Sequence, residues 1–184
     1  EAMEEHQVTA GGRRHPLAEP FFVLATQNPI EQEGTYTLPE AQLDRFMFQV
    51  MVDYPGEDEE FEIIRRTTSD ATPRATTVLD HEDVVALQQL VRQIPVADHV
   101  VRYAINLCRL SRPTRNASGS SEDFVDRYVQ WGAGPRAGQS LVLGAKARAV
   151  LGGRSFVSIE DIRAVVYPVL RHRIITSFEA EADR

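Results

Sequence analysis

Three residues stand where a side chain can act on a bound anion: Asn28, Arg45 and Arg136. Asn28 follows an apolar run at residues 20–26, which predicts a strand buried on both faces of a sheet. Open parallel sheets bind ligands just beyond the carboxyl ends of such strands, and a neutral amide there can orient water or a phosphate oxygen. The alternative is an ordinary turn asparagine before Pro29. Asn28 is therefore a candidate catalytic residue with two interpretations open.

Arg45 ends a short predicted helix at residues 39–45 and precedes a second predicted strand at residues 46–52. One interpretation is local, because an arginine at a helix C-terminus interacts favourably with the helix dipole and can pair with Asp44 or Glu40. The other is an arginine finger that reaches a nucleotide in a neighbouring subunit. Such a guanidinium stabilises the transferring phosphoryl group and contributes roughly 10³ to 10⁵ in rate.

Arg136 follows Gly134–Pro135 at the predicted start of a long helix, residues 136–151. The helix dipole disfavours a cation there by about 0.3–1 kcal/mol. A bound anion would remove this conflict, because the guanidinium and the first amides of the helix could both point at phosphate. The alternative is a solvated arginine at a tolerated cost. Arg136 is the candidate nucleotide-binding residue.

A hairpin is predicted at residues 7–15, turning on the pair Gly11–Gly12. Its tip carries Arg13, Arg14 and His15, which either face a pore or partner or form a solvated turn. The histidines show no spacing typical of a metal site, so no metal site is predicted. No Ser/His/Asp or Cys/His set typical of a nucleophilic enzyme is recognisable.

The candidate residues lie in two predicted parts of the chain, an α/β segment followed by an all-α segment. The sequence pattern predicts part of an α/β core at residues 1–54, a connecting helix and linker at residues 55–76, and a helical domain at residues 77–184. Within the helical domain, apolar periodicity predicts helices at residues 80–94, 97–110, 136–151 and 158–166, with a shorter helix or turn at 121–131. Two strands alone make a poor sheet, so residues 1–54 are expected to lean on the helices, on another chain or on further sequence.

The composition and net charge exclude several classes of protein. The 184 residues are 42% hydrophobic and 26% charged, which is typical of a globular protein. The net charge of −7 argues against general nucleic-acid binding, which needs clustered positive charge. A single cysteine, Cys108, excludes an internal disulfide. No apolar run approaches the about 20 residues of a membrane-spanning helix, and a cytoplasmic location is the default prediction.

Several strings of this sequence are informative together: residues 1–5, 7–9, 22–36 and 38–46, the pair Tyr54–Pro55 and the string 134–137. Together they closely resemble the MoxR family of AAA+ ATPases. The resemblance implies a partial AAA+ P-loop nucleotide-binding core followed by a helical lid domain. It implies that Asn28 is the sensor 1 residue, Arg45 the arginine finger acting in trans and Arg136 the sensor 2 residue in the lid. The hairpin would be the one that precedes sensor 1.

The resemblance also implies ATP hydrolysis coupled to chaperone-like remodelling or maturation of partner proteins. The expected assembly is a ring, usually of six subunits, and the expected partners include proteins with a von Willebrand factor type A domain. ATP and Mg²⁺ are the cofactors expected of the full-length protein.

The sequence departs from the family pattern at the phosphate-binding loop, which needs a lysine after a glycine-rich turn. The one lysine, Lys146, lies in no such loop, and the acidic pair that binds magnesium is also missing. The chain alone is therefore expected neither to hydrolyse ATP nor to bind nucleotide tightly. Its first residues read as the end of a helix, and we expect that it is truncated before Glu1.

Two alternatives stay open. A magnesium-chelatase-type ATPase subunit would share the hairpin and similarly placed arginines, although the string 25–29 favours MoxR. A non-catalytic protein-binding or regulatory module would keep the ring-forming surface without a nucleotide site.

Overall fold

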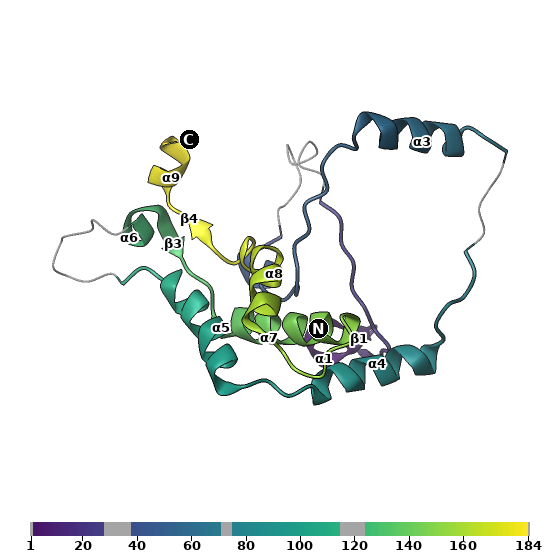
Figure 1. Cartoon of the computed structure of the whole chain (residues 1–184), viewed down its shortest axis with the longest axis horizontal. Helices are drawn as coiled ribbons and strands as arrows, with labels where there is room; N and C mark the ends of the chain where they lie inside the picture. The colour runs from purple at the N-terminus through teal and green to yellow at the C-terminus, as the bar shows by residue number, and fades with distance from the viewer. Residues whose placement is uncertain (1, 28–37, 71–74, 115–123, 184) are drawn as a thin grey trace.

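The computed structural model describes residues 2–27, 38–70, 75–114 and 124–183. Its centre is the long helix α7 (Pro135–Leu151), against which three other helices pack (Figure 1). They are α4 (His81–Gln93), α5 (Asp98–Leu110) and α8 (Ile159–Leu170). One face of α7 is fully buried and carries mostly small residues four positions apart, so the neighbouring helices approach closely. These are Ala137, Leu141, Ala145 and Ala149.

The ends of these helices follow local chemistry, as the sequence predicts. Asp80 caps α4, where its carboxylate accepts a hydrogen bond from the amide of Asp83 at 2.8 Å. Ser158 caps α8 in the same way, and Pro135 opens α7 at the first helical position. The predicted end of α8 at residue 166 is wrong. The helix continues through Pro168 to Leu170, because a proline in the last turn removes only one hydrogen bond and the helix remains packed in the core.

The C-terminal residues add a small sheet that the sequence did not predict. The short helix α6 (Phe124–Tyr128) leads into β3 (Val129–Trp131), which pairs antiparallel with β4 (Ile175–Thr176). The final helix α9 (Phe178–Ala182) returns to α6, where Arg127 pairs with Glu179 at 3.3 Å.

The N-terminal hairpin confirms its prediction. Helix α1 (Ala2–Glu5) precedes β1 (Gln7–Ala10) and β2 (Arg13–Pro16), which pair antiparallel with Val8 opposite His15. Gly11 and Gly12 have φ of 58° and 74°. Two positive φ values are what a two-residue hairpin turn requires, and glycine adopts them without strain.

The two apolar segments predicted as strands do not form strands. Residues 21–27 and 48–56 have no β assignment, and Phe22 and Val52 are 82% and 91% exposed. A buried strand needs a ladder of hydrogen-bonded neighbours and cover on both faces, and no described strand pairs with either segment. The expected sheet is therefore not present in the described residues, and the domain limits at residues 54 and 76 stay predictions.

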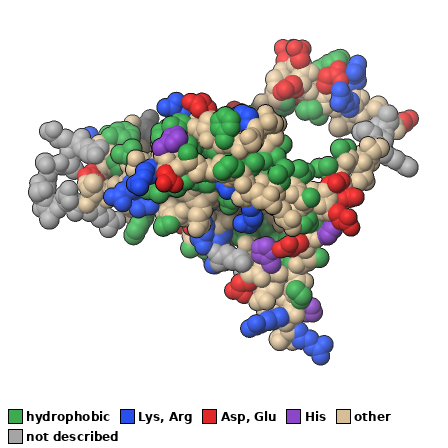
Figure 2. Space-filling view, turned by 60° about the horizontal axis from the view of Figure 1, so that its bottom comes forward, with side chains coloured by type: hydrophobic (Ala, Val, Ile, Leu, Met, Phe, Trp, Pro, Cys, Tyr) green, Lys and Arg blue, Asp and Glu red, His purple; other side chains and the backbone are tan. Residues whose placement is uncertain are grey.

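The connecting helix α3 (Glu57–Thr67) forms as predicted but stands apart from the helices around α7 (Figure 1). It begins with four consecutive acidic residues and ends with Arg65 and Arg66, and Figure 2 shows these opposite charges close together on it. None of its residues is buried, and Phe61 is 64% exposed. The short helix α2 (Glu40–Leu43), preceded by Pro39, also agrees with the sequence.

Candidate functional site

Arg45 lies in the turn that ends α2, where the sequence placed it. The turn is held by backbone hydrogen bonds, from the amide of Asp44 to the carbonyl of Glu40 at 2.9 Å and from the amide of Arg45 to the carbonyl of Gln42 at 3.2 Å. The Arg45 residue is half-buried. Residues 44–49 then run across the surface formed by α7 and α8.

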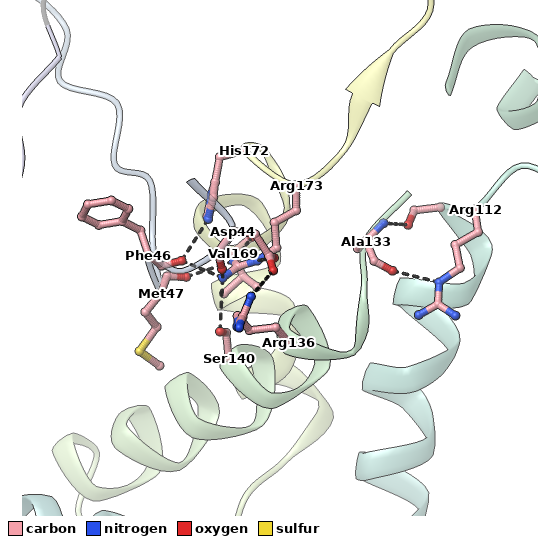
Figure 3. A network of polar contacts seen from close by, with 11 residues as sticks. Asp44, Phe46, Met47, Arg112, Ala133, Arg136, Ser140, Val169, His172 and Arg173 are labelled. Atoms are coloured by element: carbon pink, nitrogen blue, oxygen red, sulfur yellow. Dashed lines mark hydrogen bonds and ion pairs between the residues drawn. The ribbon is translucent and has the colours of Figure 1, made fainter. Parts of the chain in front are cut away.

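Asp44 joins α2 to the helical domain. Its Oδ2 accepts a hydrogen bond from Arg136 Nη1 at 2.6 Å, and its Oδ1 accepts one from Arg173 Nε at 2.9 Å (Figure 3). Arg136 comes from the first turn of α7, and Arg173 follows the end of α8. The structure therefore places Arg136 against the residue that directly precedes Arg45.

The ion pair with Asp44 compensates the unfavourable position of the Arg136 cation at the helix N-terminus. A cation at a helix N-terminus needs a compensating anion, and in the structure the anion is the carboxylate of Asp44. The Arg136 side chain remains 42% exposed and that of Asp44 is 32% exposed, so the pair lies at the surface. The role of Arg136 toward nucleotide stays a prediction.

Arg173 is the functional candidate that sequence reasoning missed. Its side chain is 1% exposed, and its guanidinium donates to a ring of oxygens around the turn after α2 (Figure 3). The acceptors besides Asp44 Oδ1 are the carbonyls of Asp44 at 2.8 Å, Phe46 at 2.6 Å, Met47 at 3.2 Å and Val169 at 2.5 Å, with Ser140 Oγ at 3.5 Å. The sequence signal was weak, because Arg171, His172 and Arg173 form a basic run of the kind that often follows a helix.

Asp44, Arg136 and Arg173 form a charged cluster in which the carboxylate lies between two guanidinium groups. Partial burial alone would raise the pKa of Asp44, but the hydrogen bonds and charges of Arg136 and Arg173 outweigh burial and lower that pKa. Burial lowers the pKa of Arg173, and Asp44 opposes this effect. Arginine keeps its proton in proteins, so Arg173 is a buried cation beside a carboxylate.

His172 adds a second contact to the same turn. Its Nε2 lies 3.0 Å from the carbonyl oxygen of Phe46, which can only accept, so Nε2 carries the proton and donates. Burial, followed by the charge of Arg173, lowers the pKa of His172 and favours the neutral ring.

Two further contacts hold residues 48 and 49 on the helices. The amide of Gln49 donates to the carbonyl of Pro168 at 2.8 Å. The Phe48 ring lies over Gly144 of α7, where an added Cβ would come within 3.0 Å of the ring. The absence of a side chain at Gly144 thus lets the ring reach the helix backbone.

The remaining predicted residues are not part of this cluster. Asn28 lies outside the described residues. Arg13, Arg14 and His15 are exposed on β2, and no described hydrogen bond or ion pair joins them to Asp44, Arg136 or Arg173. Lys146 lies within α7 and donates to the carbonyl of Arg92 at 2.9 Å, a helix-to-helix contact with no phosphate-binding loop around it.

Among the described residues, no group of three or more His, Cys, Asp or Glu side chains could hold a metal ion. The cluster instead offers guanidinium groups, which are suited to binding phosphate oxygens. Arg136 is a partly exposed cation at the N-terminus of a long helix, a setting in which a guanidinium and helix amides can bind phosphate together.

Comparison with known proteins identifies two matched regions, one at each end of the chain. The family model described as "ATPase family associated with various cellular activities (AAA)" matches residues 1–48, and the AAA lid domain model matches residues 121–184. Chaperone MoxR1 of Mycobacterium tuberculosis is 40% identical over 183 residues, covering 100% of this chain and 48% of the relative. Protein MoxR of Paracoccus denitrificans is 34% identical over 190 residues, covering 99% of this chain and 56% of the relative.

Over its whole length the chain is similar to MoxR proteins, and two parts of it match models of AAA ATPases. The chain is also similar to a crystal structure from Cytophaga hutchinsonii, of a protein described as a presumed ATPase. Its TM-score is 0.87 with 38% sequence identity, covering 99% of this chain and 55% of that one. The chain spans about half the length of these relatives. None of its described helices is both long and apolar enough to cross a membrane.

Proposed function

We propose that this chain is the part of a MoxR-type ATPase that brings two arginines, Arg45 and Arg136, to ATP bound by a neighbouring subunit. The observation that carries the proposal is the 2.6 Å contact between Arg136 Nη1 and Asp44 Oδ2. It ties the first turn of α7 to the residue next to Arg45, so both arginines belong to one surface of one subunit.

This geometry suggests how the two arginines act together. An arginine finger works by stabilising charge on the transferring phosphoryl group of another subunit. If Arg45 reaches across the subunit boundary, we expect Arg136 to face the same boundary, because Arg136 contacts the residue directly before Arg45. Arg136 then contacts the neighbour's nucleotide, and the carboxylate of Asp44 is the partner that it exchanges for phosphate.

The same proposal extends to the whole protein. ATP binding and hydrolysis, with Asn28 as sensor 1, would drive chaperone-like remodelling or maturation of partner proteins, in keeping with the name of the relative Chaperone MoxR1. The assembly would be a cytoplasmic ring, proposed to be a hexamer, with von Willebrand factor type A domain proteins among its partners. The exposed hairpin residues Arg13, Arg14 and His15 would contact a pore or a partner.

Magnesium chemistry is not assigned to the described residues. They include no cluster of ligands for a metal, so the charge stabilisation proposed for them comes from guanidinium groups alone. ATP and Mg²⁺ would be bound by the full-length protein, and the 184-residue chain by itself is still expected to be inactive.

The test is ATP turnover by the full-length protein and by its Arg45→Ala and Arg136→Ala variants. Each variant is expected to lose turnover and to regain it when mixed with subunits that keep both arginines but lack the phosphate-loop lysine. Rescue occurs because the mixed-in subunit supplies the arginines to the variant's intact nucleotide site.

The outcomes separate the alternatives. If Arg45→Ala is rescued and Arg136→Ala is not, Arg136 serves the nucleotide of its own subunit and the shared-surface proposal fails. Absence of turnover in the wild-type ring would instead favour a non-catalytic binding module.

A further inference from the structure

We infer that Arg173 is a positioning residue, which fixes the turn carrying Arg45 onto the helical domain and aligns Arg136 beside it. The inference rests on the proposed function, because it assigns Arg173 a part in presenting the two arginines. It concerns a residue that does not itself reach nucleotide.

The hydrogen bonds of Arg173 account for every donor that it has. A guanidinium carries five N–H groups. In the five shorter bonds, Nε donates to the carboxylate of Asp44, Nη1 to the carbonyls of Met47 and Val169, and Nη2 to the carbonyls of Asp44 and Phe46. Nη2 also makes a longer contact of 3.5 Å with Ser140 Oγ. With a side chain 1% exposed, Arg173 has neither a spare donor nor an open path to phosphate.

Four of these five bonds go to the turn at residues 44–47, and the fifth goes to α8. The carbonyls on either side of Arg45, those of Asp44 and Phe46, are both bound by Nη2, at 2.8 and 2.6 Å. The backbone that carries Arg45 is therefore fixed relative to α8. In the described residues no β-ladder holds this segment, so the guanidinium does what sheet pairing would otherwise do.

The same guanidinium acts on Arg136 through Asp44. One carboxylate oxygen faces Arg173 and the other faces Arg136, so fixing Asp44 sets where Arg136 lies at the start of α7. A shift of α8 relative to α7 would thus move both proposed nucleotide contacts together. Misplacing a catalytic group by about 1 Å can cost about 10²-fold in rate.

The experiment uses the full-length protein with Arg173→Lys and Arg173→Gln. Lysine keeps the charge but has only three donors in a different geometry, so it cannot make the five bonds. We expect kcat for ATP to fall about 10- to 100-fold. The KM for ATP should change much less, because the phosphate-binding loop is untouched. Ring assembly is measured by mass photometry.

The decisive readout is rescue in trans. Variant subunits are mixed with subunits that keep Arg173 but lack the phosphate-loop lysine, and turnover is expected to recover as it does for Arg45→Ala. A residue needed only for the stability of its own subunit would not be rescued this way. Arg171→Gln is the matched control, because Arg171 is exposed and, within the described part of the chain, its side chain donates only to the carbonyl of Tyr167.

Asp44→Asn provides a second variant, should neither Arg173 variant assemble. Asp44 is partly exposed, and asparagine keeps its shape while it loses the charge that both arginines contact. It too should lower kcat and be rescued in trans. Wild-type turnover of variants that assemble, or lost turnover without rescue, would overturn the inference. Failure of wild-type turnover, or of the rescue of Arg45→Ala, would overturn the proposed function instead.

Discussion

Replacing Asp161 with asparagine should destabilise the helical domain, because this carboxylate fixes the start of α8. Its side chain is 2% exposed and accepts hydrogen bonds from Arg154 at 2.5 and 2.6 Å. It also accepts from the amide and hydroxyl of Ser158 at 3.0 and 3.1 Å. Since α8 leads to Arg173 at its far end, the same contact supports the candidate site.

The size of the effect follows from the pKa of Asp161. The hydrogen bonds of Arg154, helped by Ser158, outweigh burial and lower this pKa from 3.8 to about 2. At about 1.4 kcal/mol for each pKa unit, the charged form contributes about 2 kcal/mol to the free energy of unfolding. Removing one partner of a buried pair typically costs about 3–5 kcal/mol. Arg154 is 35% exposed and can turn to water, so we expect a loss of about 2–3 kcal/mol at pH 7.

The sign of the pH dependence is fixed by the lower pKa in the folded state. The stabilisation is complete well above pH 3.8 and is lost as the pH falls from 3.8 toward 2, because the unfolded chain takes up the proton first. About 1 kcal/mol should be gone at pH 3. Asp161→Asn should lack this loss, so the difference between wild type and variant should shrink on acidification.

Urea unfolding of the 184-residue chain, followed by far-UV circular dichroism and by the fluorescence of Trp131, measures both quantities. Glu160→Gln is the matched control, because Glu160 is an exposed carboxylate in the same turn of α8. It should change stability by less than about 0.5 kcal/mol. A loss of under 1 kcal/mol for Asp161→Asn at pH 7, or an equal difference at pH 7 and pH 3, would refute the reasoning.

Two substitutions and one labelling experiment test the packing of the helical domain. Gly132→Ala should cost about 1–3 kcal/mol in the free energy of unfolding by urea, because its Cβ would collide with the carbonyl oxygen of Ser111; a neutral result would contradict that packing. Gly144→Ala would place a Cβ 3.0 Å from the Phe48 ring, which is 39% exposed and can tilt. It should therefore lower ATP turnover of the full-length protein and leave the melting temperature nearly unchanged. A lower melting temperature with unchanged turnover would count against docking of this segment. Cys108 is 2% exposed and burial raises its pKa, so a thiol reagent at pH 8 should label it far more slowly than in urea; equal rates would disprove its burial.

Local signals in the sequence predicted most helices and the hairpin. Asp80 and Ser158 are capping residues whose side chains satisfy the first amides of α4 and α8, and such caps act over three residues. The pair Gly11–Gly12 predicted its turn for the same reason, since positive φ is a property of single residues. What depends on a few neighbouring residues can be predicted from them.

The predicted strands failed because a strand is not a local property. The apolar runs at residues 20–26 and 46–52 have the composition of buried strands, but the described residues give them no ladder partner. Phe22 and Val52 are exposed as a result. The extension of α8 past Pro168 was missed for a related reason, because packing of Val169 and Leu170 in the core outweighs one lost hydrogen bond.

The candidate site divides between what the sequence could and could not predict. Arg136 was found because its position at a helix start creates an electrostatic conflict visible in sequence, although its partner in the structure is Asp44. Arg173 was missed because its decisive contacts are with residues 126–129 positions away, as in the bond to Asp44. No periodicity or spacing distinguishes it from Arg171.

Burial explains why two arginines that share one carboxylate should act differently. Arg173 is enclosed and uses all five N–H groups on protein oxygens, so releasing it would leave a buried charge without partners, which is costly. Arg136 is 42% exposed, and its contact with Asp44 lies at the surface, where an ion pair contributes only about 0–1 kcal/mol. Under the proposed function, a nucleotide phosphate would therefore compete for Arg136 but not for Arg173. On the same proposal, the buried arginine holds Asp44 in place, and the exposed arginine exchanges that carboxylate for phosphate.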